Sequence, residues 1–550
     1  MRRIPTIIAA AFLAAACTSV EEGPDSGAEA PACDPDLVSA LGKWADAGFS
    51  GAVAVTGGGT ECRAAFGTAD GTAPNTDDTV FAIGSVSKGF TAAAILGLAD
   101  DGALALDDKA GDLLPGLTGP AADATVEQLL LHTSGLEGEH GSDHEPLDRD
   151  EAITAISGFT SAFEPGSDFG YSNGGYTLLA LIVDEVTGSY RDHMAGEVLT
   201  LGGEPFGGFW DGEPAAPGPR AVGTVDGEPS TENGGFPGPY WAMEGNGDLA
   251  MTAGNLADWT KALFEGEVIS PAAVETLTGT AFDNGDGTAE IPGWVSVGPD
   301  MFGTPFVTAS GGGGDTGHNA TAVWLPDLGM SIAVTSNSEE VIAGDLAQAI
   351  APALAAGEEV PVPEGHAEAD PEELAAAEGT YTLETGGTYT VAATEDGLDV
   401  AAAGADAVTA MFASADYTAE DVAAHEDLVA ALLAGETDAG REELDALEGD
   451  LGDIERVELA GTAEEQGELR TYATLFTADG ELLVWYALDE RGGVGAVTLG
   501  AEPPAFTLVP TGEGEYRREL TGAGDGVRVA FADGLMTVTG PAGSVEATRD

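Results

Sequence analysis

The chain has 550 residues, which at about 150 residues per domain suggests two to four domains, and its 43% hydrophobic content predicts that most of it folds. The formal net charge is −77, from 95 acidic and 18 basic side chains. This imbalance argues against nucleic-acid binding, which needs clustered Lys and Arg, and against charge-driven attachment to anionic lipid. Only four of the basic residues are lysines, so a lysine inside a chemical motif is less readily a coincidence here.

The N-terminus carries two arginines before an apolar run over residues 4–16. This run is too short for a membrane-spanning helix and ends in small residues, which is typical of a secretory signal. Its end, LAAAC, resembles a bacterial lipoprotein signal, in which Cys17 becomes the acylated first residue of the mature chain. An ordinary signal peptide with a chance cysteine is the alternative. Residues 18–32 are acidic and turn-rich, which predicts a flexible tether.

The interpretation of the other two cysteines depends on whether Cys17 is lipidated. The chain has three cysteines, and if Cys17 is lipidated, Cys33 and Cys62 remain as an even pair in an oxidising compartment. This favours a disulfide between Cys33 and Cys62. The cysteine spacing matches no zinc pattern, so we expect no metal bound by these residues.

The first half of the chain alternates helices and strands. Asp34 as N-cap and Pro35 as first residue predict a helix that Gly48 can close. Strands are expected at 51–56 and 60–66, around a turn of three glycines. Further helices are expected at 85–100, 125–131, 176–187 and 255–264, and two more strands at 321–325 and 330–335.

The second half differs in pattern. Residues 356–373 are rich in Pro, Gly and Glu and predict a linker. Alternating apolar and polar residues then predict a mainly β domain over 374–550, with a helical insertion at about 419–448. The segment DNGDG at 283–287 misses the spacing of a calcium loop and is more simply a hairpin turn.

One motif could carry chemistry at the start of a predicted helix. Ser85 and Lys88 stand three residues apart, so the amine can approach the hydroxyl on one helix face. A serine is a weak nucleophile until a base accepts its proton, and Lys88 can serve if burial lowers its pKa. Alone, the pattern also fits an N-cap serine followed by an exposed lysine.

A second candidate is Tyr171-Ser172-Asn173, which follows a Pro-Gly turn. A phenol and an amide at this spacing can point into one cleft. Tyr171 could relay a proton to the leaving group, and Asn173 could hold a substrate carbonyl. Alone, these residues also fit a turn tyrosine and a helix-capping asparagine.

Five segments in combination resemble the serine β-lactamase and penicillin-binding protein superfamily, in its class C β-lactamase-like branch of esterases, D-aminopeptidases and D-alanyl-D-alanine carboxypeptidases. They stand in the family's order: FAIGSVSKGFTAAAILGLADDGALALDD, VEQLLLHTSGL, FGYSNGGYTLLALIVDEVTG, GNGDLAMTAGNLADWTKAL and WLPDLGMSIAVTSN. The resemblance implies an α+β fold over 33–355, an antiparallel sheet flanked by helices with a helical subdomain. More loosely, the tail resembles the lipocalin-like domain that often follows such hydrolases.

The resemblance also implies roles for single residues. Ser85 matches the acylated nucleophile, Lys88 its proton-relay partner, Tyr171 the general base and acid, and Asn173 the residue that positions substrate. The backbone amide of Ser85 matches one half of the oxyanion hole. The family's reaction uses no metal and no organic cofactor, so none is expected.

The third motif of the family departs from its usual pattern. Aligned back from WLPDLGMSIAVTSN, the chain has Gly311 where the family has His or Lys, followed by Gly312 and Gly313, with Gly314 as the second oxyanion amide. A shift of one residue would instead place Ser310 there. In β-lactamases and carboxypeptidases this position helps to bind a substrate carboxylate, so its loss disfavours both activities.

The histidines are weaker signals. His132, in HTSGL, matches a family segment that we interpret as structural. His140 and His144 lie among carboxylates that could bind a metal, although a solvated acidic loop is the simpler interpretation. His318 could replace the missing cation, but a packing role is simpler.

The sequence thus predicts a serine hydrolase, lipid-anchored at the bacterial cell envelope and monomeric, that acts on ester or amide bonds of small molecules or peptides. An esterase or D-amino-acid peptidase is favoured over a β-lactamase or DD-carboxypeptidase. A catalytically weak envelope binding protein is a rival. An α/β-hydrolase with Ser87 as nucleophile fits poorly, because Ser85 stands where Gly-x-Ser-x-Gly needs glycine.

Overall fold

The computed structural model describes residues 33–550 apart from 226–227, 231–235, 237, 300–302, 314–315, 340, 364–368, 395–396, 413–416, 453, 466–467, 479, 489–492, 513, 519–526, 533 and 541–542. The predicted signal peptide, Cys17 and the tether therefore lie outside the described residues, and so does Gly314. No helix in the described part of the chain is long and apolar enough to cross a membrane.

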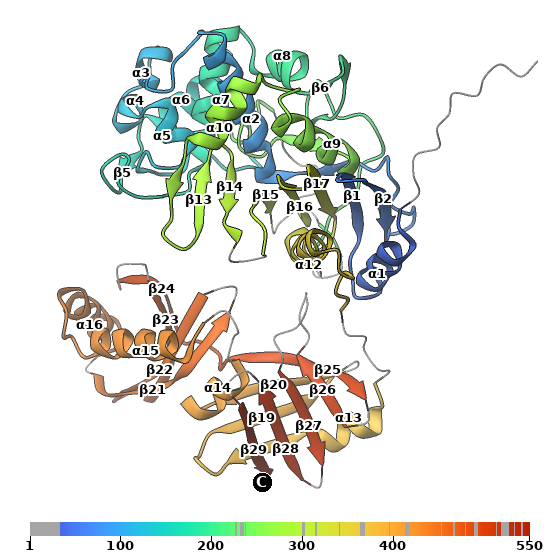
Figure 1. Ribbon diagram of the computed structural model, residues 1–550. Coiled ribbons are helices and arrows are strands. Elements are labelled where there is room, and N and C mark those ends of the chain that lie inside the picture. The colour runs from blue at the N-terminus through green and yellow to red at the C-terminus, as the bar shows by residue number, and fades with distance from the viewer. Residues whose placement is uncertain are drawn as a thin grey trace, which may run out of the picture.

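An eight-stranded antiparallel sheet forms the centre of the N-terminal unit (Figure 1), in the order β12-β13-β14-β15-β16-β17-β1-β2. Strand β1 pairs with β17 as well as with β2, so the first hairpin joins strands from the middle of the chain. The strands are β1 (Gly51–Gly57), β2 (Thr60–Phe66), β12 (Phe282–Asp283), β13 (Thr288–Ile291), β14 (Trp294–Val297), β15 (Phe306–Gly313), β16 (His318–Leu325) and β17 (Met330–Ser336).

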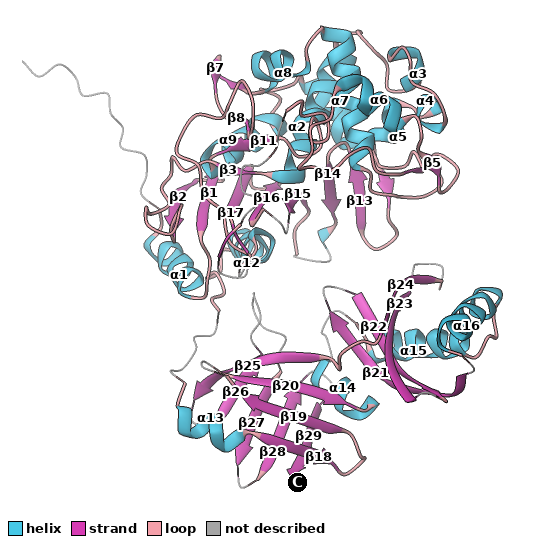
Figure 2. Ribbon diagram, turned by 180° about the vertical axis from the view of Figure 1, so that it is seen from behind, coloured by secondary structure: helices cyan, strands magenta, loops and turns pink. Residues whose placement is uncertain are grey.

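Helices cover both faces of this sheet (Figure 2), and the alternation of side chains along β1 shows how. Val53 and Val55 join one core with Trp44, and Ala52 and Ala54 join another on the opposite face. The helices are α1 (Pro35–Asp46) and α12 (Ala343–Ala356) on the first face, and α2 (Ser87–Asp100), α9 (Ala253–Phe264) and α10 (Pro271–Gly279) on the second. A disulfide between Cys33 and Cys62 ties the residues before α1 to β2.

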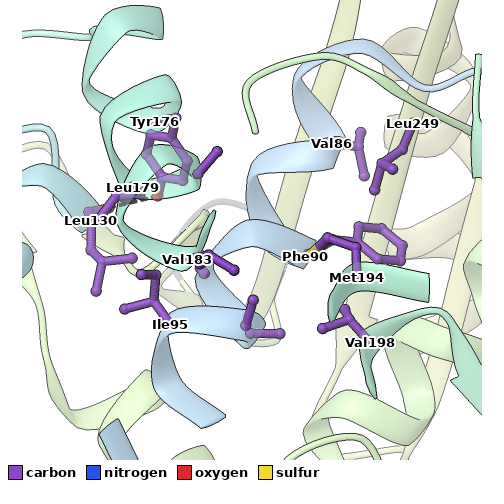
Figure 3. Close-up of a cluster of buried hydrophobic side chains, with 14 of the residues drawn as sticks. Val86, Phe90, Ile95, Leu130, Tyr176, Leu179, Val183, Met194, Val198 and Leu249 are labelled. Atoms are coloured by element: carbon purple, nitrogen blue, oxygen red, sulfur yellow. Dashed lines mark hydrogen bonds between the residues drawn. The ribbon is translucent and has the colours of Figure 1, made fainter. Parts of the chain in front are cut away.

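A helical subdomain adjoins the second face and encloses α2 (Figure 3), which places Leu179 and Val183 on one side of this helix and Met194 and Val198 on another. Helix α2 has no polar face, as expected of a helix buried all round. The subdomain contains α3 (Ala110–Leu113), α4 (Pro120–Asp123), α5 (Val126–Leu130), α6 (Arg149–Ile156), α7 (Asn173–Thr187), α8 (Tyr190–His193) and a π-helix (Met194–Val198).

Short strands complete this unit. They are β3 (Phe81–Ala82), β8 (Gly208–Phe209) and β11 (Leu249–Met251) in one small sheet, and the pairs β4 (Leu136–Glu137) with β5 (Thr160–Ser161), β6 (Thr200–Leu201) with β7 (Glu204–Pro205), and β9 (Thr224–Val225) with β10 (Glu228–Pro229). The segment predicted as a hairpin turn connects β12 and β13, which are paired.

The C-terminal unit contains a closed eight-stranded barrel, in the order β18-β19-β20-β25-β26-β27-β28-β29. Helix α13 (Pro371–Ala377) packs Leu374 and Ala377 into its core, and α14 (Ala405–Phe412) adds Met411 and Phe412. The strands are β18 (Gly379–Leu383), β19 (Thr388–Ala393), β20 (Leu398–Ala403), β25 (Ala505–Gly512), β26 (Glu515–Arg518), β27 (Arg528–Ala532), β28 (Leu535–Gly540) and β29 (Gly543–Arg549). The predicted α+β fold with a mainly β C-terminal domain is confirmed.

Two predicted boundaries need correction. The predicted linker over 356–373 is packed at both ends, because Val360 belongs to the core around Trp44 and α13 begins at Pro371. The predicted helical insertion is also larger than its helices α15 (Ala419–Leu433) and α16 (Asp438–Leu451). It includes a separate sheet of β21 (Ile454–Glu465), β22 (Glu468–Thr477), β23 (Gly480–Leu488) and β24 (Val494–Leu499), which shares its own apolar core with both helices.

Candidate active site

Ser85 lies in a three-residue 3-10 turn, Gly84–Val86, that leads directly into α2. Gly84 has φ of +49°, and a side chain there would begin 2.8 Å from the backbone nitrogen of Gly312. Only glycine therefore fits this close approach between the turn and strand β15. The result is a serine held at the N-terminal end of a buried helix, against the central sheet.

The structure brings the predicted residues of the first two motifs together. The hydroxyl oxygen of Ser85 lies 3.0 Å from Nζ of Lys88 and accepts a hydrogen bond from the Tyr171 hydroxyl at 2.8 Å. Lys88 also donates to Oδ1 of Asn173 at 2.8 Å and to the carbonyl oxygen of Asn246 at 3.0 Å. Three residues, which lie 3, 85 and 158 positions from Lys88 in the sequence, thus surround its side-chain nitrogen.

Burial makes Lys88 a candidate base. Its side chain is 3% exposed, and the loss of hydration lowers its pKa from 10.5 to about 7, against the opposing effect of the carboxylates of Asp143 and Asp248. A neutral amine keeps two N–H donors and one lone pair. The two donors match the oxygens of Asn173 and Asn246, which leaves the lone pair for the proton of Ser85.

The pKa of Tyr171 is shifted in the opposite direction to that of Lys88. Burial of its hydroxyl raises its pKa, although the hydrogen bond to Ser85 partly offsets this effect, so the phenol is protonated at neutral pH. The phenol can therefore donate its proton, but it can accept a proton only after it has lost its own. This protonation state suits Tyr171 to the general-acid part of its predicted role, the protonation of a leaving group, and the lowered pKa of Lys88 suits the lysine to accept a proton.

His132 packs against Tyr171 and holds it in place. Its ring stacks on the phenol with centroids 4.5 Å apart, and its Nδ1 accepts a hydrogen bond from the backbone of Ser172 at 3.0 Å. Burial and the nearby Lys88 lower the pKa of His132 to about 3, so the ring is neutral. The segment interpreted as structural in the sequence thus supports the second motif directly.

Helix α7 starts three residues earlier than its apolar pattern predicts. Ser172 caps it by accepting a hydrogen bond from the backbone of Gly175 at 3.1 Å. Two glycines with poor helix propensity hide this first turn from the sequence. Because Asn173 is the first helical residue, its amide and the phenol of Tyr171 both point to Ser85 and Lys88.

Sequence reasoning missed Asn246, whose carbonyl oxygen contacts Lys88. Its side chain donates to Thr177 and to the carbonyl oxygen of Ala242, both at 2.8 Å, which fixes the loop. Glu244 and Asp248 are buried in the same loop, and burial raises the pKa of both carboxyl groups. Arg191 pairs with Glu244 at 2.7 Å. The segment GNGDLAM resembles the family, but nothing in its sequence marks a backbone oxygen as functional.

The third motif differs from its sequence alignment. A side chain at Gly311 would begin 2.3 Å from the backbone nitrogen of Ser85, so neither His nor Lys fits at that position without moving the backbone. The residues of β15 that line a cavity of about 140 Å³ with Ser85 are instead Thr308, Ala309 and Ser310. None of these three carries a positive charge.

Other predicted residues lie apart from the reacting atoms. His318 is buried with its ring edge-on to Phe81 and Trp210, and burial lowers its pKa to about 4, which agrees with a packing role. Ser87 is fully buried and accepts a hydrogen bond from Leu249, so it is not accessible as a nucleophile. Within the described residues, no group of three or more His, Cys, Asp or Glu side chains is placed to hold a metal ion.

These features define a serine-lysine-tyrosine site built between an antiparallel sheet and a buried helix. Residues 38–357 match the family model described as Beta-lactamase, which is more than half of the chain, and the chain therefore belongs to that family. The superfamily predicted from the motifs is confirmed. Members of this family are mostly serine hydrolases.

Known relatives agree with this assignment. Penicillin-binding protein 4 of Amycolatopsis lactamdurans is 34% identical over 137 residues, which are 23% of this chain and 35% of that protein. Protein flp of Staphylococcus aureus (strain MRSA252) is 35% identical over 117 residues, 20% of this chain and 23% of that protein. The chain thus spans about a third or less of these relatives' length.

A solved structure extends the likeness to most of the chain. The octameric penicillin-binding protein homologue from Pyrococcus abyssi superposes with a TM-score of 0.53 and 20% identity, over 85% of this chain and 98% of that one. At this identity the likeness shows a shared fold and not a shared activity. The monomeric state expected of this chain stays a prediction.

Proposed function

We propose that the protein hydrolyses ester or amide bonds through a covalent acyl-enzyme on Ser85. The observation that carries the proposal is the position of the Ser85 hydroxyl between Lys88 and Tyr171, at 3.0 and 2.8 Å. A nucleophile, a base with a pKa of about 7 and a protonated phenol are the three groups that acyl transfer needs.

The geometry supports the following steps. Oγ of Ser85 attacks the substrate carbonyl carbon while its proton passes to Nζ of Lys88. The oxyanion is held by the backbone amide of Ser85 and, we propose, that of Gly312, which packs against the turn before Ser85. Tyr171 protonates the leaving group as the carbonyl–leaving-group bond breaks and recovers a proton from Lys88. Water then attacks the acyl carbon and releases Ser85 by the reverse proton transfers.

Asn173 is suited to hold the acyl part of the substrate. The Oδ1 atom of Asn173 accepts a hydrogen bond from Lys88, so the amide Nδ2 of the same side chain is the group left to donate a hydrogen bond to substrate. A substrate carbonyl oxygen is an acceptor that this group can bind. This assignment agrees with the role that the family resemblance implies for Asn173.

An esterase or D-amino-acid peptidase is favoured over a β-lactamase. The three residues of β15 that line the cavity of about 140 Å³ beside Ser85 are Thr308, Ala309 and Ser310, so this wall offers no cation to a substrate carboxylate. Hydrolysis of nitrocefin at the rate of short esters would reverse this preference.

The test compares Ser85→Ala with Ser544→Ala, a matched change at an exposed serine of β29. Fluorophosphonate labelling and p-nitrophenyl ester hydrolysis should be lost in the first variant and kept in the second. Retention of both activities in Ser85→Ala would refute the proposal.

We also propose that acyl chains on Cys17 anchor the protein at the bacterial envelope, which rests on the N-terminal sequence. In cells that process lipoproteins, Cys17→Ser should move the protein from the membrane fraction to the soluble fraction. Equal membrane recovery of both forms would contradict this proposal.

A further inference from the structure

Two buried carboxyl groups lie in contact within the loop that supplies Asn246. Glu244 and Asp248 are each 4% exposed, and their side chains are hydrogen-bonded to each other. Oε1 of Glu244 accepts a hydrogen bond from Arg191 at 2.7 Å, and Oδ2 of Asp248 accepts one from the backbone nitrogen of Gly245 at 3.3 Å. The other two oxygens, Oε2 of Glu244 and Oδ1 of Asp248, are buried and receive no donor from any other described residue.

One shared proton accounts for this contact. Two ionised carboxylates offer only acceptor oxygens, so they cannot form a hydrogen bond with each other. Ionisation of both would also place two negative charges in contact, and the ion pair with Arg191 compensates only one of them. With one proton between them, Oε2 and Oδ1 become a donor and an acceptor, and neither oxygen is left unpaired. Burial raises the pKa of both groups, which agrees with a proton retained at neutral pH.

The pair spans the part of the loop that contacts the catalytic lysine. Glu244 stands two residues before Asn246, and Asp248 stands two residues after it. The carboxyl group of Asp248 also holds the backbone nitrogen of Gly245, the residue next to Asn246. The bond between the two side chains therefore closes the loop around Asn246, whose carbonyl oxygen accepts a hydrogen bond from Lys88 at 3.0 Å.

Three other titratable or charged groups face the pair. Helix α8 contributes Arg191, which stays cationic, and Tyr190, which stays neutral because burial and the two carboxyl groups raise its pKa. Helix α2 contributes Lys88, whose pKa is opposed in its lowering by the charge of Asp248. A change of charge at this place near neutral pH therefore involves either Lys88 or the carboxyl pair.

We propose that Glu244 and Asp248 are positioning residues that hold one proton between them, and that this bond keeps the Asn246 carbonyl in place as an acceptor for Lys88. The inference rests on the proposed function, in which Lys88 takes the proton of Ser85. Loss of the shared proton at alkaline pH would bring two negative charges into contact and open the loop. Lys88 would then lose one of the two acceptors that orient its lone pair toward Ser85.

The kinetic test compares Glu244→Gln with Glu244→Ala. The amide of Gln can donate to Asp248 while its oxygen accepts from Arg191, so it replaces the shared proton with one that does not titrate. Glu244→Ala should lower kcat/KM for p-nitrophenyl esters about tenfold or more, and Glu244→Gln should restore most of this loss. Wild-type kcat/KM should fall about tenfold or more between its optimum and pH 10, and this fall should be absent in Glu244→Gln. Glu275→Gln, the same change at an exposed residue of α10, should keep the wild-type profile.

Infrared spectroscopy tests the proton without using activity. At pH 7 the wild-type protein should show the C=O stretch of a protonated carboxyl group, and Glu244→Gln should lack it. Absence of this band in the wild-type protein, which needs no variant, would overturn the shared proton. An alkaline fall that persists unchanged in Glu244→Gln would overturn the positioning role. Both results leave the acyl-enzyme standing as long as labelling still depends on Ser85, and loss of that dependence would refute the proposed function instead.

Discussion

Lys88 should destabilise the folded protein, and Lys88→Met should therefore raise the free energy of unfolding. A pKa lowered from 10.5 to about 7 corresponds to about 5 kcal/mol, at 1.36 kcal/mol per pKa unit. Because the folded pKa lies below the unfolded one, the unfolded chain binds more protons between pH 7 and 10.5. The penalty is therefore complete below pH 7, about 4 kcal/mol at pH 7, and absent above the unfolded pKa.

The pH dependence separates this penalty from other effects of the substitution. Met cannot donate to Asn173 or to the Asn246 carbonyl, and this loss is nearly constant with pH. The stability difference between Lys88→Met and the wild-type protein should fall by several kcal/mol as the pH rises from 6 to 10. Lys43→Met, at an exposed lysine of α1, should show no such trend.

Urea unfolding followed by tryptophan fluorescence measures this difference. Six of the seven tryptophans precede residue 364, so the signal reports on the unit that contains Lys88. A difference between Lys88→Met and wild type that stays constant from pH 6 to 10 would refute the reasoning. It would show that Lys88 has an ordinary pKa and cannot serve as the neutral base.

Three further outcomes are expected. Tyr171→Phe should lower kcat/KM for esters by about 10²–10⁴-fold, the usual contribution of a general acid, while the activity still declines below the Lys88 pKa of about 7; a loss below tenfold would contradict this role. Gly311→Ala should lower kcat/KM about 100-fold by displacing Ser85. The control Gly279→Ala should keep the wild-type kcat/KM, because no atom lies within 4 Å of the added methyl group. Equal activity of the two variants would show that β15 can move to accept a side chain at Gly311 without displacing Ser85. Added salt should raise the melting temperature by screening a net charge of −77, and a flat profile would count against self-repulsion.

Local signals made much of the fold predictable. Asp34 and Pro35 mark the start of α1, and the three glycines after β1 mark the first hairpin. The spacing of Ser85 and Lys88 placed their side chains on one helix face, and the structure has them 3.0 Å apart. These features depend on residues within one or two turns of the chain, where sequence patterns are most informative.

Long-range features could not be predicted in the same way. The carbonyl of Asn246 reaches Lys88 across 158 positions, and no side-chain pattern marks a backbone oxygen as a partner. The position of Gly311 depends on how β15 packs against the turn at Ser85, which an alignment through four consecutive glycines leaves open. The strands of the C-terminal insertion alternate like those of the barrel, so their pattern does not say which sheet they join.

Two acidic residues affect the pKa of Lys88, one of only four lysines in the chain. Burial alone would lower the pKa of Lys88 further than is useful, since an amine that is too weak a base does not hold the proton of Ser85. The carboxylates of Asp143 and Asp248 oppose this effect and keep the pKa at about 7. Asp143→Asn should therefore lower the pKa of Lys88 and move the acid limb of the kcat/KM pH profile to lower pH for every substrate. An acid limb that stays at the wild-type pH in Asp143→Asn would show that this carboxylate does not set the pKa of Lys88.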